Sequence, residues 1–278
     1  GATVRNTPQP LVAGNDWESI DFGNSHTVAL RSDGSIWVAG DSFGFSGVLP
    51  RALTRAANPG GVWQHLAGTA FSFHAVRQDG TLWHWGRASS GQFGDGSLTD
   101  RSVLFQTGTE TNWSKVESGG HTFSAASTLA LKTDGSLRSS GSNTFGQLGN
   151  GTTTNSFSFV TVAPSSGSVW SQAAVGNGFS MGIRNDGTLW GWGVNSSGQI
   201  GLGNTTSPQL QPAQIGTGTY WTRVSAGSAF AAGIRGGTLW AWGSNISGQV
   251  GDGTTTPRTA PVQVGSDTNW VEVACGAS

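Results

Sequence analysis

The sequence predicts an all-β protein with the architecture of a propeller, and three observations carry this prediction. A unit recurs about every 50 residues, a period typical of solenoids, propellers and other arrays. Short runs of β-branched and aromatic residues are joined by Asp-Gly turns, and no long segment has helical apolar periodicity. Four short strands per unit, repeated around an axis, form the blades of a propeller. Each unit is anchored by a tryptophan: Trp17, Trp63, Trp113, Trp170, Trp221 and Trp270.

Within one unit the expected elements follow a fixed order. A short extended stretch, as at residues 262–264, precedes the anchor tryptophan, and a strand with apolar residues follows it, as at 270–273. A glycine turn leads to a second apolar strand, as at 26–30. The Asp33-Gly34 turn then leads to a third strand at 36–38. We therefore expect hairpins, and no helix, throughout each unit.

The third strand and the loop behind it are the most regular parts of the unit. Residues 186–201 and 236–251 each carry Gly-Thr-Leu-Trp-x-Trp-Gly followed by Gly-Gln-x-Gly. Together with Gly-x-x-His-x-x-Ala-Leu, this pattern resembles the repeat of the regulator of chromosome condensation family, from Gln9 to Gly276. The resemblance implies a β-propeller, commonly of seven blades. The paired indoles are then expected to bury apolar area between blades, and the glutamine amide to hydrogen-bond adjacent backbone.

The resemblance also implies recognition of a partner. Members of the family serve as nucleotide-exchange factors for a small GTPase, as ultraviolet photoreceptors and as enzyme inhibitors. The exchange and photoreceptor roles do not transfer residue by residue, because the sequence has no Gly-Trp-Arg-His-Thr motif and no basic chromatin-binding tail.

The units at the two ends are incomplete. Residues 1–8 match the tail of a unit, as at 253–257, and residues 274–278 stop where a His-x-x-Ala-Leu strand is expected. We therefore expect one propeller domain over residues 1–278, with five full units and a partial sixth, and six or seven blades when complete. A missing half-blade leaves an unpaired strand edge. Three explanations stay open: cropping from a longer array, an open ring, or strands supplied by another chain.

Composition narrows the classes of function. Charged residues make up 10% of the chain, the net charge is −1, and the arginines are scattered, so we expect no nucleic-acid partner. No run of 18 apolar residues exists, and we expect no membrane span. The acidic residues mostly occupy turns, and no histidine pair has the spacing of metal ligands. We therefore predict no catalytic, cofactor-binding or metal-binding residue, no cofactor and no enzymatic activity.

Residues that all copies of the unit share are explained by packing. We therefore expect binding residues at positions where one copy differs from the others. Unit three replaces Leu-Trp-x-Trp-Gly by residues 137–141, which place Arg138 where others have tryptophan; this blade is either remodelled for a ligand or degenerate with a loosened interface. Unit one has Phe43 and Phe45 on an expected loop, where they suit either a protein contact or packing on the next blade. Arg87 stands where later copies have Val194 and Ser244, as a solvated arginine or a contact residue.

These observations favour a non-enzymatic protein-interaction scaffold that binds another protein or further copies of itself. One alternative is a self-assembling extracellular or surface protein that uses the incomplete terminal unit. A second alternative is a glycan-binding propeller. We expect an extracellular or cell-surface location, with a cytoplasmic one left open.

Overall fold

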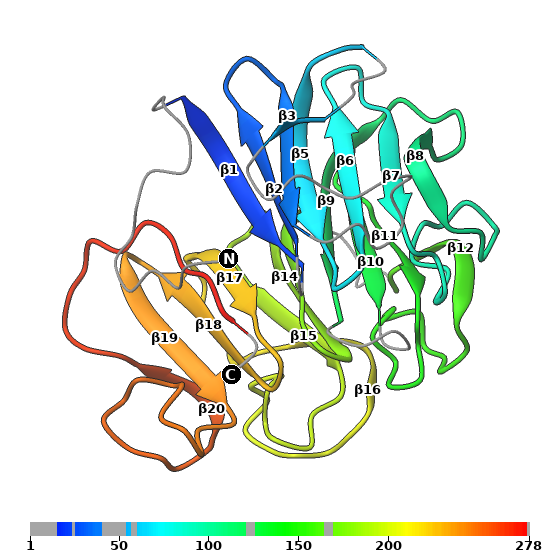
Figure 1. Cartoon of the computed structure of the whole chain (residues 1–278). Coiled ribbons are helices and arrows are strands. Elements are labelled where there is room, and N and C mark those ends of the chain that lie inside the picture. Colours follow the sequence, from blue (N-terminus) through cyan, green and yellow to red (C-terminus); the bar gives the residue numbers. More distant parts are fainter. Residues whose placement is uncertain are drawn as a thin grey trace, which may run out of the picture.

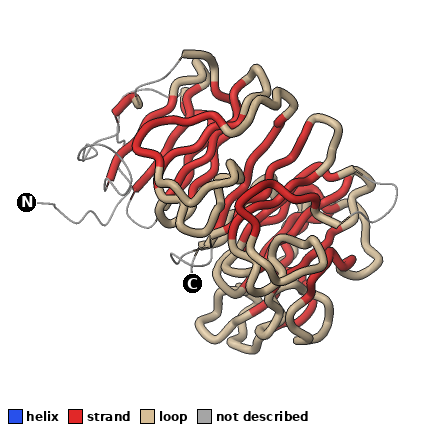
Figure 2. The backbone as a smooth tube through the Cα atoms, turned by 90° about the vertical axis from the view of Figure 1, so that its right-hand side faces the viewer, coloured by secondary structure: helices blue, strands red, loops and turns tan. Residues whose placement is uncertain are grey.

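The computed structural model describes residues 16–23, 26–40, 54–56, 60–120, 126–163 and 169–276. These residues form an all-β propeller of five antiparallel four-stranded blades, and they contain no helix (Figures 1 and 2). The strands occur in chain order within every blade, as the hairpin pattern predicts. The expected fold class and the five units are therefore confirmed. Residues 264–276 form no strand, so the partial sixth blade and a total of six or seven blades stay predictions.

The strands of the five blades are similar in length, except that β4 of blade 1 has only two described residues. Their bounds are, for blade 1, β1 Trp17–Phe22, β2 His26–Arg31, β3 Ile36–Gly40 and β4 Thr54–Arg55; for blade 2, β5 Trp63–Gly68, β6 Ser72–Arg77, β7 Leu82–Gly86 and β8 Arg101–Gln106; for blade 3, β9 Trp113–Gly119, β10 Ser127–Lys132, β11 Leu137–Gly141 and β12 Ser156–Thr161; for blade 4, β13 Trp170–Val175, β14 Phe179–Arg184, β15 Leu189–Gly193 and β16 Gln209–Gln214; for blade 5, β17 Trp221–Ala226, β18 Phe230–Arg235, β19 Thr238–Gly243 and β20 Arg258–Gln263.

The first strand of each blade lies at the centre of the ring. These inner strands contact one another in series, β1 with β5, β5 with β9, β9 with β13 and β13 with β17. The strand order places two kinds of connection at opposite ends of the blades. We call the side with the turns at Gly34, Gly80, Gly135, Gly187 and Gly237 the hairpin face. The side with the Gly-Gln loops at 91–94, 146–149, 198–201 and 248–251 is the loop face.

In blades 1 to 4 an Asp-Gly turn closes the central hairpin by side-chain chemistry. In blade 4 the Asp186 carboxylate accepts hydrogen bonds from the Thr188 amide at 2.9 Å and from its hydroxyl at 2.6 Å. The Trp190 indole then donates to the same hydroxyl at 2.8 Å. Gly187 has φ 76°, and a Cβ there would lie 2.7 Å from the backbone nitrogen of Tyr220. Turn chemistry thus accounts for this aspartate, as the sequence predicts.

In blades 4 and 5 the second tryptophan of Leu-Trp-x-Trp fastens the blade to the one before it. Trp192 is fully buried, and its indole donates to the carbonyl oxygen of Gln147 at 2.8 Å. Trp242 repeats this contact with the carbonyl oxygen of Gln199 at 3.0 Å. The expected role between blades is therefore confirmed for the second indole of these two pairs, whereas the first indole packs on the anchor tryptophan of its own blade.

Blade 3 keeps a packed interface although its tryptophan is missing. Ser140 occupies the tryptophan position, is fully buried, and donates its hydroxyl to the carbonyl oxygen of Gln92 at 3.1 Å. In blades 3 and 4 the last glycine of the Gly-Gln loop lies against the second indole of the following blade. The equivalent glycine of blade 2, Gly94, lies against the ring of Phe159 instead. Phe159 also packs on Trp113, with ring centroids 5.0 Å apart. A phenylalanine from the outer strand therefore fills the place of the indole.

Candidate functional site

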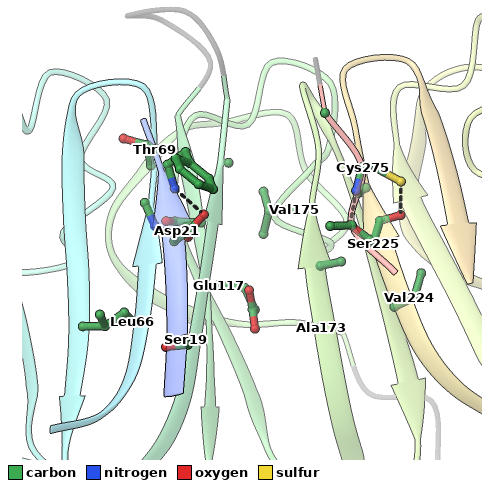
Figure 3. A pocket seen from close by; sticks show the side chains of 18 of the residues that line it. Ser19, Asp21, Leu66, Thr69, Glu117, Ala173, Val175, Val224, Ser225 and Cys275 are labelled. Atoms are coloured by element: carbon green, nitrogen blue, oxygen red, sulfur yellow. Dashed lines mark hydrogen bonds between the residues drawn. The ribbon is translucent and has the colours of Figure 1, made fainter. Parts of the chain in front are cut away.

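A cavity of about 750 Å³ lies at the centre of the ring. Six segments line it: the five inner strands and residues 272–276, which lie beside β17 (Figure 3). Side chains alternate along a strand, so residues two and four places after each anchor tryptophan share one face. In β1 and β9 the second of these positions holds Asp21 and Glu117, both of which line the cavity.

Several of these side chains join neighbouring inner strands. The Asp21 carboxylate accepts a hydrogen bond from the Gly68 amide of the next blade at 2.6 Å. The Gln172 side-chain oxygen accepts one from the Val224 amide at 3.0 Å. The Ser225 hydroxyl accepts one from the Cys275 amide at 2.9 Å. Because each partner lies about 50 residues further along the chain, these bonds hold the channel wall together from blade to blade.

Burial controls the ionisation of the groups in the cavity. Glu117 projects into it, with one carboxyl oxygen 3.6 Å from Nε2 of His65. Burial, together with the negative charge of Asp21, raises the pKa of Glu117 to about 8. Burial, together with the charge of Lys115, lowers the pKa of His65 to about 4. At neutral pH the pair is therefore a protonated carboxyl beside a neutral imidazole, and not an ion pair.

Stability is expected to fall between about pH 6.5 and 8 because of Glu117. The folded protein keeps the carboxyl proton up to about pH 8, whereas the unfolded chain loses it near 4.5, so rising pH favours the unfolded chain. The lowered pKa values of His65, His74 and His84 act in the opposite sense, but only below their ordinary value of 6.5. Urea midpoints across this pH range measure the effect. Glu117→Gln should flatten the decline, and an unchanged slope in that variant would contradict the assignment.

Comparing the copies of the repeat with one another does not reveal this cavity. The position two places after the anchor holds a different residue in every copy, so nothing repeats there: Ser19, His65, Lys115, Gln172, Arg223 and Glu272. The residues that line the cavity could have been predicted from two facts together: side chains alternate along a strand, and the first strand of each blade is the innermost.

The four predicted binding residues do not form one site. Phe43 and Phe45 lie outside the described residues. Arg87 follows the end of β7 on the loop face, with its guanidinium 5.9 Å from the Phe71 ring centroid. Arg138 is the second residue of β11, close to the hairpin face, and donates to the Thr161 hydroxyl at 2.5 Å. A partner-binding role for each of them stays a prediction.

Exposed apolar side chains mark both faces. On the hairpin face Tyr220 is 75% exposed, and it is the only non-glycine residue of the described chain with positive φ, at 71°. Its carbonyl oxygen accepts a hydrogen bond from the Gly236 amide at 3.1 Å. On the loop face Ile246 is 76% exposed. Tyr220 thus combines an outward aromatic ring with a backbone held in an uncommon conformation.

The part of the chain that the structure describes contains no group of three or more histidine, cysteine or acidic side chains placed to hold a metal ion. Among the same residues, none forms a helix with the length and apolar character needed to cross a membrane.

Five antiparallel blades around a central cavity, with indole hydrogen bonds between blades 3 and 4 and between blades 4 and 5, define a β-propeller built from repeats. The model of the regulator of chromosome condensation (RCC1) repeat matches residues 134–183, 186–234 and 236–278. A second model of this repeat matches residues 17–44 and 170–199. The chain belongs to the RCC1 repeat family.

Two relatives match different lengths of this chain. The chain is 31% identical over 222 residues to the ultraviolet-B receptor UVR8 of Arabidopsis thaliana, covering 75% of this chain and 48% of the receptor. A second relative, human protein RCC2, is 35% identical over 108 residues, covering 38% of this chain and 21% of RCC2. The chain therefore spans half or less of the length of these relatives.

Solved structures share the fold at low sequence identity. Human WBSCR16 matches with a TM-score of 0.82 and 21% identity, covering 94% of this chain and 70% of that one. Prp20p of Saccharomyces cerevisiae, described with its binding properties to Gsp1p and histones, matches with a TM-score of 0.80 and 20% identity, covering 91% and 65%. At this identity the likeness shows the fold alone.

Proposed function

We propose that the chain is a non-enzymatic propeller that binds another protein on its hairpin face, with Tyr220 at the centre of the contact. Tyrosine is enriched among the residues that carry binding energy at protein interfaces. Its large ring has few rotatable bonds and so loses little entropy on binding. The exposed ring of Tyr220 has both properties, and this is the observation that carries the proposal.

The backbone beneath Tyr220 supports the same proposal. A non-glycine residue with positive φ is strained, and such strain clusters at binding and catalytic sites. Gly187 lies directly against the Tyr220 backbone, and the Gly236 amide holds its carbonyl group. Hairpin turns of two neighbouring blades therefore hold the backbone that carries the tyrosine ring. Because this backbone is already fixed, Tyr220 loses little conformational entropy when a partner binds. The relatives add support, since Prp20p is described by its binding to proteins.

Affinity capture with matched variants tests the proposal. Tyr220→Asn removes the ring while keeping a residue that tolerates positive φ. Ile246→Asn removes a similarly exposed apolar side chain from the loop face and serves as the control. Partner capture, quantified by mass spectrometry from cells that express the chain, should fall at least tenfold for Tyr220→Asn only. Equal capture by both variants, at unchanged melting temperature, would contradict a hairpin-face site.

A further inference from the structure

Glu117 of β9 projects into the central cavity without joining two inner strands (Figure 3). Asp21 and Ser225 occupy the same position of their own strands, four places after the anchor tryptophan. Each accepts a hydrogen bond from an amide of the neighbouring inner segment, at 2.6 and 2.9 Å. Glu117 has no hydrogen bond to any described residue. Polar groups inside a protein normally have a hydrogen-bond partner, so this carboxyl group is available to a ligand.

His65 of the neighbouring strand β5 orients the Glu117 carboxyl. Nδ1 of His65 accepts a hydrogen bond from the Val116 amide at 3.5 Å, so in the neutral imidazole the ring proton is on Nε2. Nε2 lies 3.6 Å from one carboxyl oxygen of Glu117 and directs its N–H toward it. The second carboxyl oxygen of Glu117 can therefore accept a hydrogen bond from a molecule in the cavity.

The charges around Glu117 favour a positively charged ligand. Five side chains around the cavity carry charge or can titrate: Asp21 of β1, His65 of β5, Lys115 of β9, Arg223 of β17 and Glu272. Arg223 pairs with Glu272 at 2.9 Å, and Lys115 donates to the carbonyl oxygen of Ser171 at 3.4 Å. Burial and the charge of Asp21 raise the pKa of Glu117 to about 8, although Lys115 acts in the opposite sense. At pH 7 a proton therefore neutralises this carboxyl, where a bound cation could do so instead.

We propose that the corner of the cavity formed by Asp21, His65 and Glu117 binds the ammonium group of a primary amine. An ammonium group has three N–H donors and no acceptor, and ionised carboxyl groups are acceptors only. As the amine binds, the O–H bond of Glu117 breaks and its proton passes to solvent. A cavity of about 750 Å³ accommodates an organic molecule, whose hydrocarbon part lies along Leu66 and Val175. An ammonium group fits better than a metal ion, because the described residues offer no set of three metal ligands.

Pentylamine and 1-pentanol test the proposal by titration calorimetry, because they share one hydrocarbon chain and only the amine is charged at pH 7. We expect saturable binding of pentylamine and at least tenfold weaker binding of 1-pentanol. Titrations in phosphate and in Tris, which differ in their heats of protonation, measure the number of protons released. Close to one proton per bound amine is expected at pH 7. The number should fall as the pH passes the pKa of Glu117, about 8, because the carboxyl is then already ionised.

Two variants locate the bound ammonium group. Glu117→Gln keeps the shape of the protonated side chain, and it should weaken pentylamine binding at least tenfold and abolish proton release. Glu272→Gln removes a carboxyl from the same cavity, but one that is 74% exposed and paired with Arg223, so binding should be unchanged. No binding of pentylamine at millimolar concentration, or equal binding of 1-pentanol, would overturn the proposal. Equal weakening by both variants would also overturn it, because the net charge of the cavity alone would then attract the amine.

Discussion

Trp192→Ala is expected to lower the free energy of unfolding by about 3–5 kcal/mol, the range for removing a buried aromatic side chain from a core. The Trp192 ring is fully buried between blades 3 and 4, where it packs on Trp170 with ring centroids 5.7 Å apart. The substitution leaves a cavity and also removes the indole donor from the carbonyl oxygen of Gln147. Urea unfolding followed by circular dichroism measures the loss.

Two variants separate the contributions at Trp192. Trp192→Phe keeps most of the apolar volume and loses the hydrogen bond, so a cost of about 1–2 kcal/mol is expected. Trp190→Ala removes the half-buried indole two residues earlier, which packs on Arg184 and Trp170 of its own blade. It should cost less than Trp192→Ala. If Trp190→Ala proves the more damaging, the indole at Trp192 does not fasten the two blades.

The sequence predicts the fold well because its signals are local and repeated. The Asp186-Gly187 turn and the Leu-Trp-x-Trp strand have fixed offsets, and each offset corresponds to a contact within a blade or to the adjacent one. The channel could not be predicted in the same way, since Glu117 and His65 occupy positions that no other copy repeats. Their proximity depends on two neighbouring inner strands converging at the centre of the ring, which no single unit contains.

The altered third unit shows a second limit. When the copies are compared position by position, Ser140 shows only that a tryptophan is missing. A loosened interface between this blade and its neighbour is then a reasonable expectation. The compensating side chain, Phe159, lies on the outer strand β12, and residues there vary between copies for reasons of exposure as well as packing. Only the three-dimensional contact of Phe159 with Gly94 links the two changes.

A double-mutant cycle on Ser140 and Phe159 is expected to show strong coupling. Ser140→Trp alone forces an indole into space that Phe159 fills, and overpacking of this kind costs about 1–3 kcal/mol. Phe159→Ala alone opens a cavity beside Gly94 and Trp113, at a cost of about 2–3 kcal/mol for a partly buried ring. In the double variant the new indole occupies the space that the phenyl ring leaves.

The double variant should therefore be more stable than the sum of the two single effects by about 1–3 kcal/mol. Its indole can donate to the carbonyl oxygen of Gln92, which Ser140 now uses, as Trp192 does to that of Gln147. Denaturant unfolding of the four proteins under one set of conditions measures the coupling. Phe157→Ala, on the same outer strand and 42% exposed, replaces Phe159→Ala in a control cycle where the effects should simply add. If the changes in the free energy of unfolding are additive in both cycles, Phe159 does not fill the space of the missing indole.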